Sequence, residues 1–428
     1  MFNLILKEMI KKVIFSMAAV ALLTFSCTRS EVENFNITTP NAISLNPNTA
    51  STRAAIMDLD SLKLDVYGFV VYADTVGTAI SDDWFIDRAN HVFGTDGWGF
   101  YPSILWPNTG YPLVFLAYYP DDSNSGVITG VTTPALPFTS SSLELAISIP
   151  PEKGLQEDIL VARDTQLIEK PSNGQLQIDF KHILSKVNFT VSTSDGTSLI
   201  TDPDHKAYIL AVGFSNLFST NTFEAVDDTW GPLAPGDPTA DYNYHNAFVG
   251  LTGADIYDEI EFVNADKNPF FTGAAADTSH LMLLPQDPIK WVVTGTIAAP
   301  TNEAHIKMLY RLQVSGNDDF IGYLHADDHD DYSTTPSIAG YTDQLYVLVG
   351  FSYAGTWESG KGYSYDIPLP GKGGGIYLDV NYYDNQGNKT DLVIPGAVIG
   401  GHVLGIDHIT LDPDITNWNN QTSTEVED

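Results

Sequence analysis

The chain has 428 residues, of which 43% are hydrophobic and 11% aromatic, a composition that supports packed cores and excludes wholesale disorder. Its 54 acidic residues far outnumber its 20 basic residues, and the formal net charge is −34. A surface of this sign repels nucleic acid and anionic lipid headgroups, so we expect no nucleic-acid partner. The length accommodates two or three domains at the usual ~100–200 residues each.

The N-terminal residues have the pattern of an export signal. Lys11 and Lys12 precede an apolar run, residues 13–25, which is shorter than the ~20 residues that a membrane-spanning helix needs. The single cysteine, Cys27, follows and cannot form an intramolecular disulfide. The segment resembles a bacterial lipoprotein signal, which implies a signal peptide over residues 1–26 and an acylated Cys27 held in outer-membrane lipid. A plain secretory signal with an idle cysteine, and a buried N-terminal helix, are the alternatives.

Residues 27–53 are polar and rich in Asn, Thr and Ser, which predicts a tether or propeptide, although the stretch VENFNITT has the pattern of one strand. Arg53 lies at its end, in the small-residue stretch NTASTRAAIMD, which has no competing strand pattern. Exposed segments of this kind are favoured sites of proteolysis. Cleavage between Arg53 and Ala54 is therefore one hypothesis, and an ordinary surface arginine is the other.

After Arg53 the pattern becomes that of an all-β protein. Short stretches of β-branched and aromatic residues alternate with Gly, Pro, Asn and Asp turns, and they include YPLVFLAYYP (111–120), VNFTVS (187–192) and LYVLVGFSYA (345–354). Many short strands with turn signals at modest spacing predict β-sandwiches.

Helical and inter-domain segments are scarce in this pattern. The stretches EDILVARDTQL (157–167) and FKHILSKV (180–187) are the most helix-like, and we expect a helical turn in them. A polar break at residues 193–204 predicts a boundary between an N-terminal domain, 54–197, and a C-terminal domain, 198–428.

Several stretches, in the same order along the chain, resemble the fimbrillin family, the lipoprotein pilus subunits of diderm bacteria that assemble after proteolysis. They are WPNTGYPLVFLAYYP (106–120), EDILVARD (157–164), IDFKHILSKVNFTVS (178–192), LMLLPQ (281–286) and GKGYSYDIPL (360–369). Near the C-terminus ITLDPDITNW (409–418) resembles the closing strand of the family. The Gly-rich insert at 371–401 departs from the family pattern.

The resemblance implies two tandem transthyretin-like β-sandwich domains and a precursor exported through the periplasm to the outer membrane and the pilus. It also implies an arginine-specific protease that cuts at Arg53 and removes an N-terminal strand, for which ENFNITTP is the candidate. A strand from another pilus subunit then fills the groove by donor-strand exchange, and a homo- or hetero-polymer for adhesion grows. Such a subunit has no catalytic activity and no cofactor. The alternative is a surface-anchored or pilus-tip lipoprotein that binds a glycan or a host or bacterial receptor and does not polymerise.

The candidate donor strand is the C-terminal stretch HVLGIDHITLDPDITNW, in which apolar residues recur along the strand. They are Ile406, Ile409, Leu411, Ile415 and Trp418. Such a strand either inserts into a neighbour or pairs within its own chain as an ordinary edge strand. The sequence leaves both alternatives open.

One acidic cluster has the residue types of a metal site. His325, Asp327, Asp328 and His329 lie together in HADDHDDY, and carboxylate and imidazole groups bind calcium or transition metals. The spacing is not that of an EF-hand loop, and we interpret the stretch as a solvated acidic turn. The sequence has no G-x-S-x-G, H-E-x-x-H or P-loop motif, so we expect no enzyme, although a secreted hydrolase with an unmarked pair of acids is a third alternative.

Overall fold

The computed structural model describes residues 44–49, 65–70, 72–73, 79–80, 84–94, 97–100, 104–106, 113–120, 125–132, 143–168, 175–192, 205–225, 227–243, 260–262, 268–269, 280–292, 300–314, 320–321, 345–368, 375–384, 386–394, 397–400 and 410–417. These segments are built almost wholly from β-strands, which confirms the all-β prediction. Their one helical element is a single 3-10 turn, η2 (Lys153–Leu155). No helix among them is long and apolar enough to cross a membrane.

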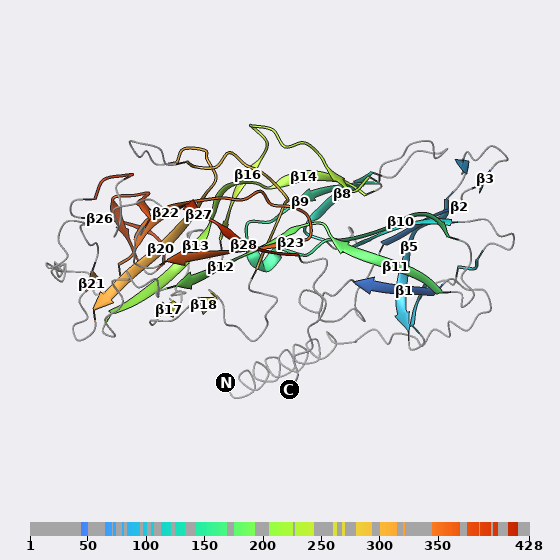
Figure 1. The fold of residues 1–428 in the computed structure, drawn as a ribbon, viewed down its shortest axis with the longest axis horizontal. Coiled ribbons are helices and arrows are strands. Elements are labelled where there is room, and N and C mark those ends of the chain that lie inside the picture. Colours follow the sequence, from blue (N-terminus) through green and yellow to red (C-terminus); the bar gives the residue numbers. More distant parts are fainter. Residues whose placement is uncertain are drawn as a thin grey trace, which may run out of the picture.

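The N-terminal strands close into a barrel at one end of an elongated molecule (Figure 1). Seven strands form the ring in the order β1-β11-β10-β7-β2-β5-β6. Their bounds are β1 (Ser44–Thr49), β2 (Asp65–Val70), β5 (Trp84–Gly94), β6 (Gly97–Phe100), β7 (Leu113–Tyr119), β10 (Leu160–Ile168) and β11 (Gln175–His182). A two-stranded ribbon, β3 (Tyr72–Ala73) and β4 (Ala79–Ile80), is separate from the ring. This ring differs from the open sandwich that the sequence predicts for the N-terminal region, because β1 bridges β11 and β6.

The C-terminal strands form two sheets at the other end of the molecule (Figure 1). The first has the order β18-β12-β23-β28, with β19 also paired to β12. Its strands are β12 (Ser185–Ser192), β18 (Asn268–Pro269), β19 (Leu281–Leu283), β23 (Lys361–Pro368) and β28 (Pro413–Asn417).

The second sheet has the order β16-β13-β20-β22-β24, with three short strands paired alongside. Its strands are β13 (His205–Phe218), β16 (Thr239–Asn243), β17 (Ile260–Phe262), β20 (His305–Val314), β21 (Phe320–Ile321), β22 (Val347–Tyr353), β24 (Ile376–Tyr377) and β27 (Thr410–Leu411).

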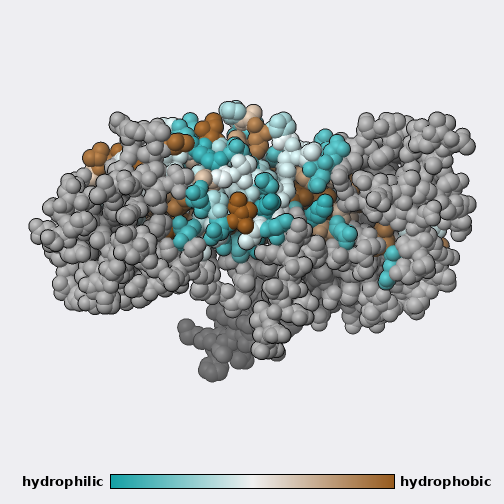
Figure 2. Space-filling model, in the orientation of Figure 1, coloured by the Kyte–Doolittle hydropathy of each residue, from teal (hydrophilic) through white to brown (hydrophobic). Residues whose placement is uncertain are grey.

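An aromatic core packs the two C-terminal sheets face to face. Phe189 on β12 lies with its ring centroid 5.0 Å from that of Phe214 on β13, and Phe214 also contacts Tyr353, Trp357 and Tyr365 at 5.1–5.7 Å. All five rings are buried, and aromatic pairs in such tilted and edge-on arrangements stabilise a core beyond their buried area. This region is therefore a β-sandwich. Over its outer face, hydrophilic residues predominate in the coloured part of Figure 2, with separate apolar patches.

A small sheet connects the barrel half of the chain to the sandwich half. It has the order β15-β14-β9-β8 and joins β8 (Ile128–Thr132) and β9 (Glu144–Ser148) to β14 (Thr220–Glu224) and β15 (Thr229–Trp230). Strand β12 likewise precedes the polar break in the sequence yet pairs in parallel with β23 along seven residues. Strands from both sides of the break thus share sheets. The break itself lies outside the described residues, and the boundary at 197/198 stays a prediction, as does transthyretin-like topology.

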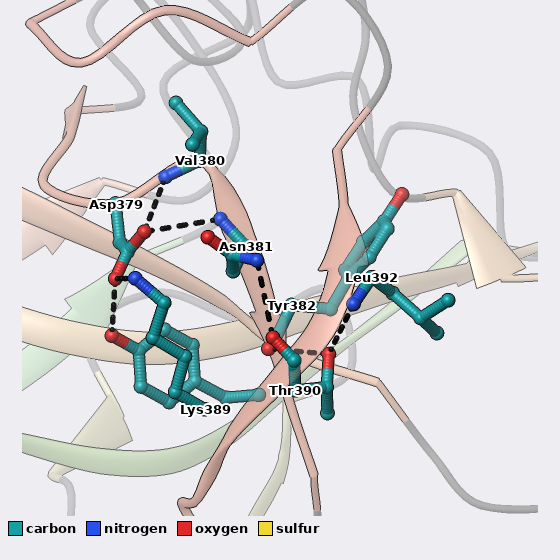
Figure 3. A network of polar contacts seen from close by, with 8 residues as sticks. Asp379, Val380, Asn381, Tyr382, Lys389, Thr390 and Leu392 are labelled. Atoms are coloured by element: carbon teal, nitrogen blue, oxygen red, sulfur yellow. Dashed lines mark hydrogen bonds and ion pairs between the residues drawn. The ribbon is translucent and has the colours of Figure 1, made fainter.

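The Gly-rich insert contributes a hairpin to the sandwich end, β25 (Asn381–Tyr383) with β26 (Lys389–Val393). Asp379 holds this hairpin (Figure 3): one carboxylate oxygen accepts from the backbone N–H of Val380 and Asn381, and the other accepts from the Tyr383 hydroxyl at 2.9 Å and from Lys389 Nζ at 2.6 Å. Burial alone would raise the pKa of Asp379, but the hydrogen bonds from Lys389 and Tyr383 outweigh it and lower this pKa below its ordinary value.

The expected helical turns are wrong. The stretch at 157–167 lies largely in strand β10, and the stretch at 180–187 is the end of β11 and the start of β12 with a tight connection between them. Ile159, Leu160, Val161 and Ala162 are all buried, on both faces of the strand. A continuous apolar run of this length does not distinguish a buried strand from a helix, and pairing with β7 and β11 decides for the strand.

Candidate assembly site

The leader strand β1 lies between two strands of the barrel. It pairs in parallel with β11 over six residues, from Ser44 opposite Gln175 to Thr49 opposite Phe180. On its other side it pairs with β6 only through Ser44 and Leu45. Without β1 the ring has no link between β6 and β11. We call this position, between β6 and β11, the leader slot.

The wall of the leader slot formed by β11 has a buried face and an exposed face. Leu176 and Phe180 are 1% and 3% exposed, whereas Gln175 and Asp179 are exposed to solvent. This is the alternation of a strand with one face on a core. The register brings Leu45 and Thr49 opposite the two buried positions.

The leader strand was missed by sequence reasoning. The candidate ENFNITTP, at 33–40, lies outside the described residues, and the strand that the structure has is SLNPNT at Ser44–Thr49. Asn46, Pro47 and Asn48 indicate a turn by composition. Proline is tolerated in a strand where no N–H is needed, and β6 pairs only with the two residues at the start of β1, so Pro47 lies beyond the two-sided pairing.

The processing residues lie outside the described part of the chain. Cys27, Arg53 and Ala54 therefore stay predictions. What the structure adds is the order of elements: β1 ends at Thr49, four residues before Arg53, and the body of the barrel resumes at β2. A cut at Arg53 would leave β1 without a covalent link to the rest of the barrel.

The C-terminal stretch pairs within its own chain. Thr410 and Leu411 form β27 in parallel with β22, and residues 413–417 form β28 antiparallel to β23, at the edge of the first sandwich sheet. Within the single chain it is therefore an edge strand, and its use as a donor to a neighbour stays a prediction. Leu411 is 4% exposed and its carbonyl accepts from Ala354 N–H at 2.8 Å, whereas Ile415 is 57% exposed. Ile406, Ile409 and Trp418 lie outside the described residues.

Two glycines let β28 lie close to the sheet. A Cβ built on Gly362 would lie 2.6 Å from Thr416 Oγ1, closer than atoms can approach without a shift. A Cβ on Gly355 would lie 3.1 Å from Pro413 Cγ, and the Gly355 φ of +97° favours glycine in any case. Apart from these contacts β28 has little burial, because Asp414, Ile415, Thr416 and Asn417 are all exposed. The strand is held mainly by its backbone ladder.

Basic residues lie on and near strands β12 and β19 of the same sheet, with β23 between them and β28. Lys186 pairs with Gly362 on one side and with Met282 on the other, and His280 lies two residues from Met282. Burial, with the charges of Lys186 and Lys153, lowers the pKa of His280 to about 3, so its ring is neutral at physiological pH. Burial also lowers the pKa of Lys153 to about 8. Two lysine charges, those of Lys186 and Lys153, thus lie near a neutral His280.

A buried polar pair braces the end of the slot wall. His182, the last residue of β11, lies with Nδ1 2.5 Å from Asp158 Oδ2, and both side chains are almost fully buried. The backbone N–H of Ile183 donates to the carbonyl of Ile159 beside them at 3.1 Å. The pair therefore connects the end of β11 to the start of β10, and we interpret it as a contact that stabilises the fold.

The acidic stretch that the sequence analysis interprets as a solvated turn, with a metal site as the weaker reading, is not tested by the structure. His325, Asp327, Asp328 and His329 fall outside the described residues. Within the described segments no three His, Cys, Asp or Glu side chains are grouped so as to hold a metal ion.

Comparison with known proteins places the chain in a family. A sequence model of the fimbrillin-like family matches residues 52–381. The chain belongs to the fimbrillin-like family. Members of this family are pilus or adhesin subunits of the cell surface, which is the role this fimbrillin-like chain has in outline. The matched residues include neither β1 nor β28, so family membership by itself assigns nothing to those two strands.

Solved structures also resemble this fimbrillin-like chain. A fimbrial protein from Bacteroides vulgatus ATCC 8482 is 14% identical, with 82% of this chain and 98% of that chain covered and a TM-score of 0.49. A candidate cell adhesion protein from Bacteroides ovatus ATCC 8483 is 15% identical, with 76% and 91% covered and a TM-score of 0.37. No curated protein matches the chain.

Proposed function

We propose that this chain is a structural pilus subunit, exported as a lipoprotein precursor, cut after Arg53, and polymerised by donor-strand exchange into the leader slot. The observation that carries the proposal is the placement of β1. It completes the barrel by pairing on both sides, yet the predicted cleavage site lies between it and the rest of the chain.

The energetics favour exchange once the link is cut. A vacated slot presents unpaired N–H and C=O groups of β11 and β6 and the apolar wall at Leu176 and Phe180. Open strand edges of this kind pair readily with another chain, with main-chain hydrogen bonds supplying affinity and alternate side chains supplying specificity. Because slot and donor are different surfaces, the contact is head-to-tail, and it builds a filament when the rotation from one subunit to the next does not close a ring.

Acylated Cys27 anchors the precursor in the outer membrane, and an arginine-specific protease releases the body from this anchor. Other pilus subunits are the partners, and the polymer serves adhesion to a host or bacterial surface. A structural role of this kind requires no catalysis and no cofactor.

The experiment is cleavage of the exported chain by an arginine-specific protease, followed by electrophoresis without boiling. We expect a mature N-terminus at Ala54 and a ladder of SDS-resistant multimers. Arg53→Ala should abolish both, whereas the matched control Arg29→Ala should abolish neither, because Arg29 lies ahead of β1. A body that is trimmed at Ala54 and stays monomeric at high concentration would overturn the polymerisation proposal.

A second candidate function is supported by the closing strand. Because β28 pairs within its own chain, a subunit that never releases it would accept a donor without donating one. Such a chain is a tip or anchor adhesin. It would be trimmed at Arg53 and bind one other subunit, but it would form no ladder alone.

A further inference from the structure

A ladder of seven residue pairs joins β12 to β23 in the first sandwich sheet. The two strands run in parallel, and their register extends from Lys186 opposite Gly362 to Ser192 opposite Pro368. This is the longest parallel pairing among the described strands. Because parallel strands have their N-terminal ends on the same side, the resistance of the ladder to force depends on which ends are pulled.

The N-terminal end of β12 is coupled directly to the barrel. β11 ends at His182 and β12 begins at Ser185, so only Ile183 and Leu184 lie between the wall of the leader slot and the ladder. Both connecting residues are buried, and the backbone N–H of Ile183 donates to the carbonyl of Ile159 at 3.1 Å. In Figure 1 the two strands follow one another along the long axis of the molecule. A pull on β11 therefore reaches the N-terminal end of β12.

The C-terminal end of β23 is coupled to the C-terminal strands through short pairings. The chain leaves β23 at Pro368 and continues through β24, β25, β26 and β27 to the end of β28 at Asn417. β24 and β27 each pair with β22 through two residues only. β28 is antiparallel to β23 with Asn417 opposite Lys361, so a pull on its C-terminal end opens its pairs one after another. The same pull then reaches the C-terminal end of β23.

We propose that the ladder between β12 and β23 is a mechanical clamp that carries tension through the subunit, and that residues 369–417 extend before the clamp breaks. The inference rests on the proposed function, because a filament joined through the barrel and the C-terminal strand loads each subunit along this path. β12 is then held at its N-terminal end while β23 is pulled at its C-terminal end. All seven pairs are loaded together, in shear.

Buried side chains oppose sliding of β23 along β12. Phe189 lies opposite Tyr365 in the register, with the ring centroids 6.4 Å apart and both rings buried. The Tyr365 hydroxyl donates to the carbonyl of Ala354 at 3.0 Å and accepts from Trp357 Nε1 at 2.9 Å. A slip by one residue would turn these buried side chains to the outer face. The ladder therefore yields as a unit and does not slide by steps.

The order of the events under load follows from the sizes of the pairings. A hydrogen bond contributes ~0.5–1.5 kcal/mol net, so pairings of two residues, or pairs that open one at a time, yield at low force. Seven pairs loaded together, with an aromatic core behind them, yield last. Residues 369–417 span at most ~170 Å when fully extended. The subunit therefore lengthens under tension while the clamp holds.

The test is single-molecule pulling of the full chain with Cys27→Ser, which removes the single native thiol. DNA handles are attached to two introduced cysteines. Asp179→Cys on β11 with Asn417→Cys loads the ladder in shear. The matched control, Asp179→Cys with Glu358→Cys, pulls β23 from its N-terminal end and opens the ladder one pair at a time. All three replaced residues are exposed.

We expect the shear variant to extend at low force by up to ~170 Å and then to break at a force several-fold higher than the control. Equal breaking forces in the two variants, or loss of the ladder in the first event, would overturn the clamp. Because the pulled molecule is a monomer, either result would leave the proposed function intact. The proposed function is scored separately, by SDS-resistant multimers of the trimmed body, so the two failures are distinguishable.

Discussion

The leader strand β1 and the closing strand β28 are held in opposite ways. β1 has a partner on each side within the barrel, and its link to the body of the chain contains Arg53. β28 has a partner on one side only and is continuous with the body through β27. The comparison teaches what the proposed function requires of each strand: β1 would be retained only while the peptide bond at Arg53 is intact, and β28 would be retained only while no better site is open to it.

The largest expected effect concerns the wall that holds β1. His182→Ala leaves Asp158 buried without the His182 hydrogen bond, which should lower the free energy of unfolding by ~3–5 kcal/mol. Urea denaturation of the full chain measures this. Lys181→Ala is the matched control, since Lys181 is 61% exposed and its pair with Asp228, at 4.0 Å, should contribute less than ~1 kcal/mol. Equal effects of the two changes would show that the buried pair does not brace β11.

A site remote from both strands should change stability without changing assembly. Asp379→Asn removes the charge that Lys389 and Tyr383 stabilise, and should cost about 1–3 kcal/mol at pH 7. Because the folded-state pKa of Asp379 is lowered, this contribution is present above the unfolded-state pKa of ~3.9 and is lost as the pH falls through the folded-state value.

Urea unfolding of Asp379→Asn and the parent chain between pH 7 and pH 4 measures the difference, which should narrow toward the acid end. Multimer yield after trimming at neutral pH should be unchanged. A loss of multimers would mean that the hairpin of β25 and β26 takes part in the joint.

Ile415→Thr should distinguish the two positions of the closing strand β28, which are its place beside β23 in its own chain and its proposed place in the leader slot of another subunit. The monomer should keep its stability to within ~0.5 kcal/mol because the side chain is 57% exposed at home. The joint between subunits should weaken by ~1–2 kcal/mol, or roughly 5–30-fold, because the slot loses buried apolar area. Multimer dissociation in graded SDS measures the second effect. Thr416→Ser, a change at the neighbouring exposed residue, should change neither quantity.

Gly362→Ala should release β28 from its own sheet. The added methyl group meets Thr416 Oγ1 at 2.6 Å, and relieving this overlap should cost about 1 kcal/mol of home pairing. Trimmed protein should then assemble several-fold faster, as followed by the time course of multimers on gels. A second change, Thr416→Ala, should restore the original rate of assembly. Slower assembly of Gly362→Ala would contradict the view that pairing of β28 with β23 in its own chain limits strand exchange.

The amino-acid sequence by itself determined the class of the protein. Stretches such as VNFTVS and LYVLVGFSYA are strands in the structure because β-branched and aromatic residues at alternate positions pack well on a pleated, half-buried surface. Motifs such as FKHILSKVNF identified the family, which the match over residues 52–381 confirms. These features are local: each depends on residues close together in the sequence, so it can be recognised without knowing which segments lie beside it in the fold.

Only the tertiary structure decided how the ends of the chain are used. SLNPNT has the composition of a turn, and it is a strand because β6 and β11 present two open edges with room for a proline. The run at 159–162 is a strand and not a helix because its residues are buried on both faces and its two edges pair with β7 and β11. The C-terminal strands β27 and β28 pair within their own chain because β22 and β23 present free edges next to them. Strand pairing joins residues far apart in the chain, so its outcome depends on which edges meet in space.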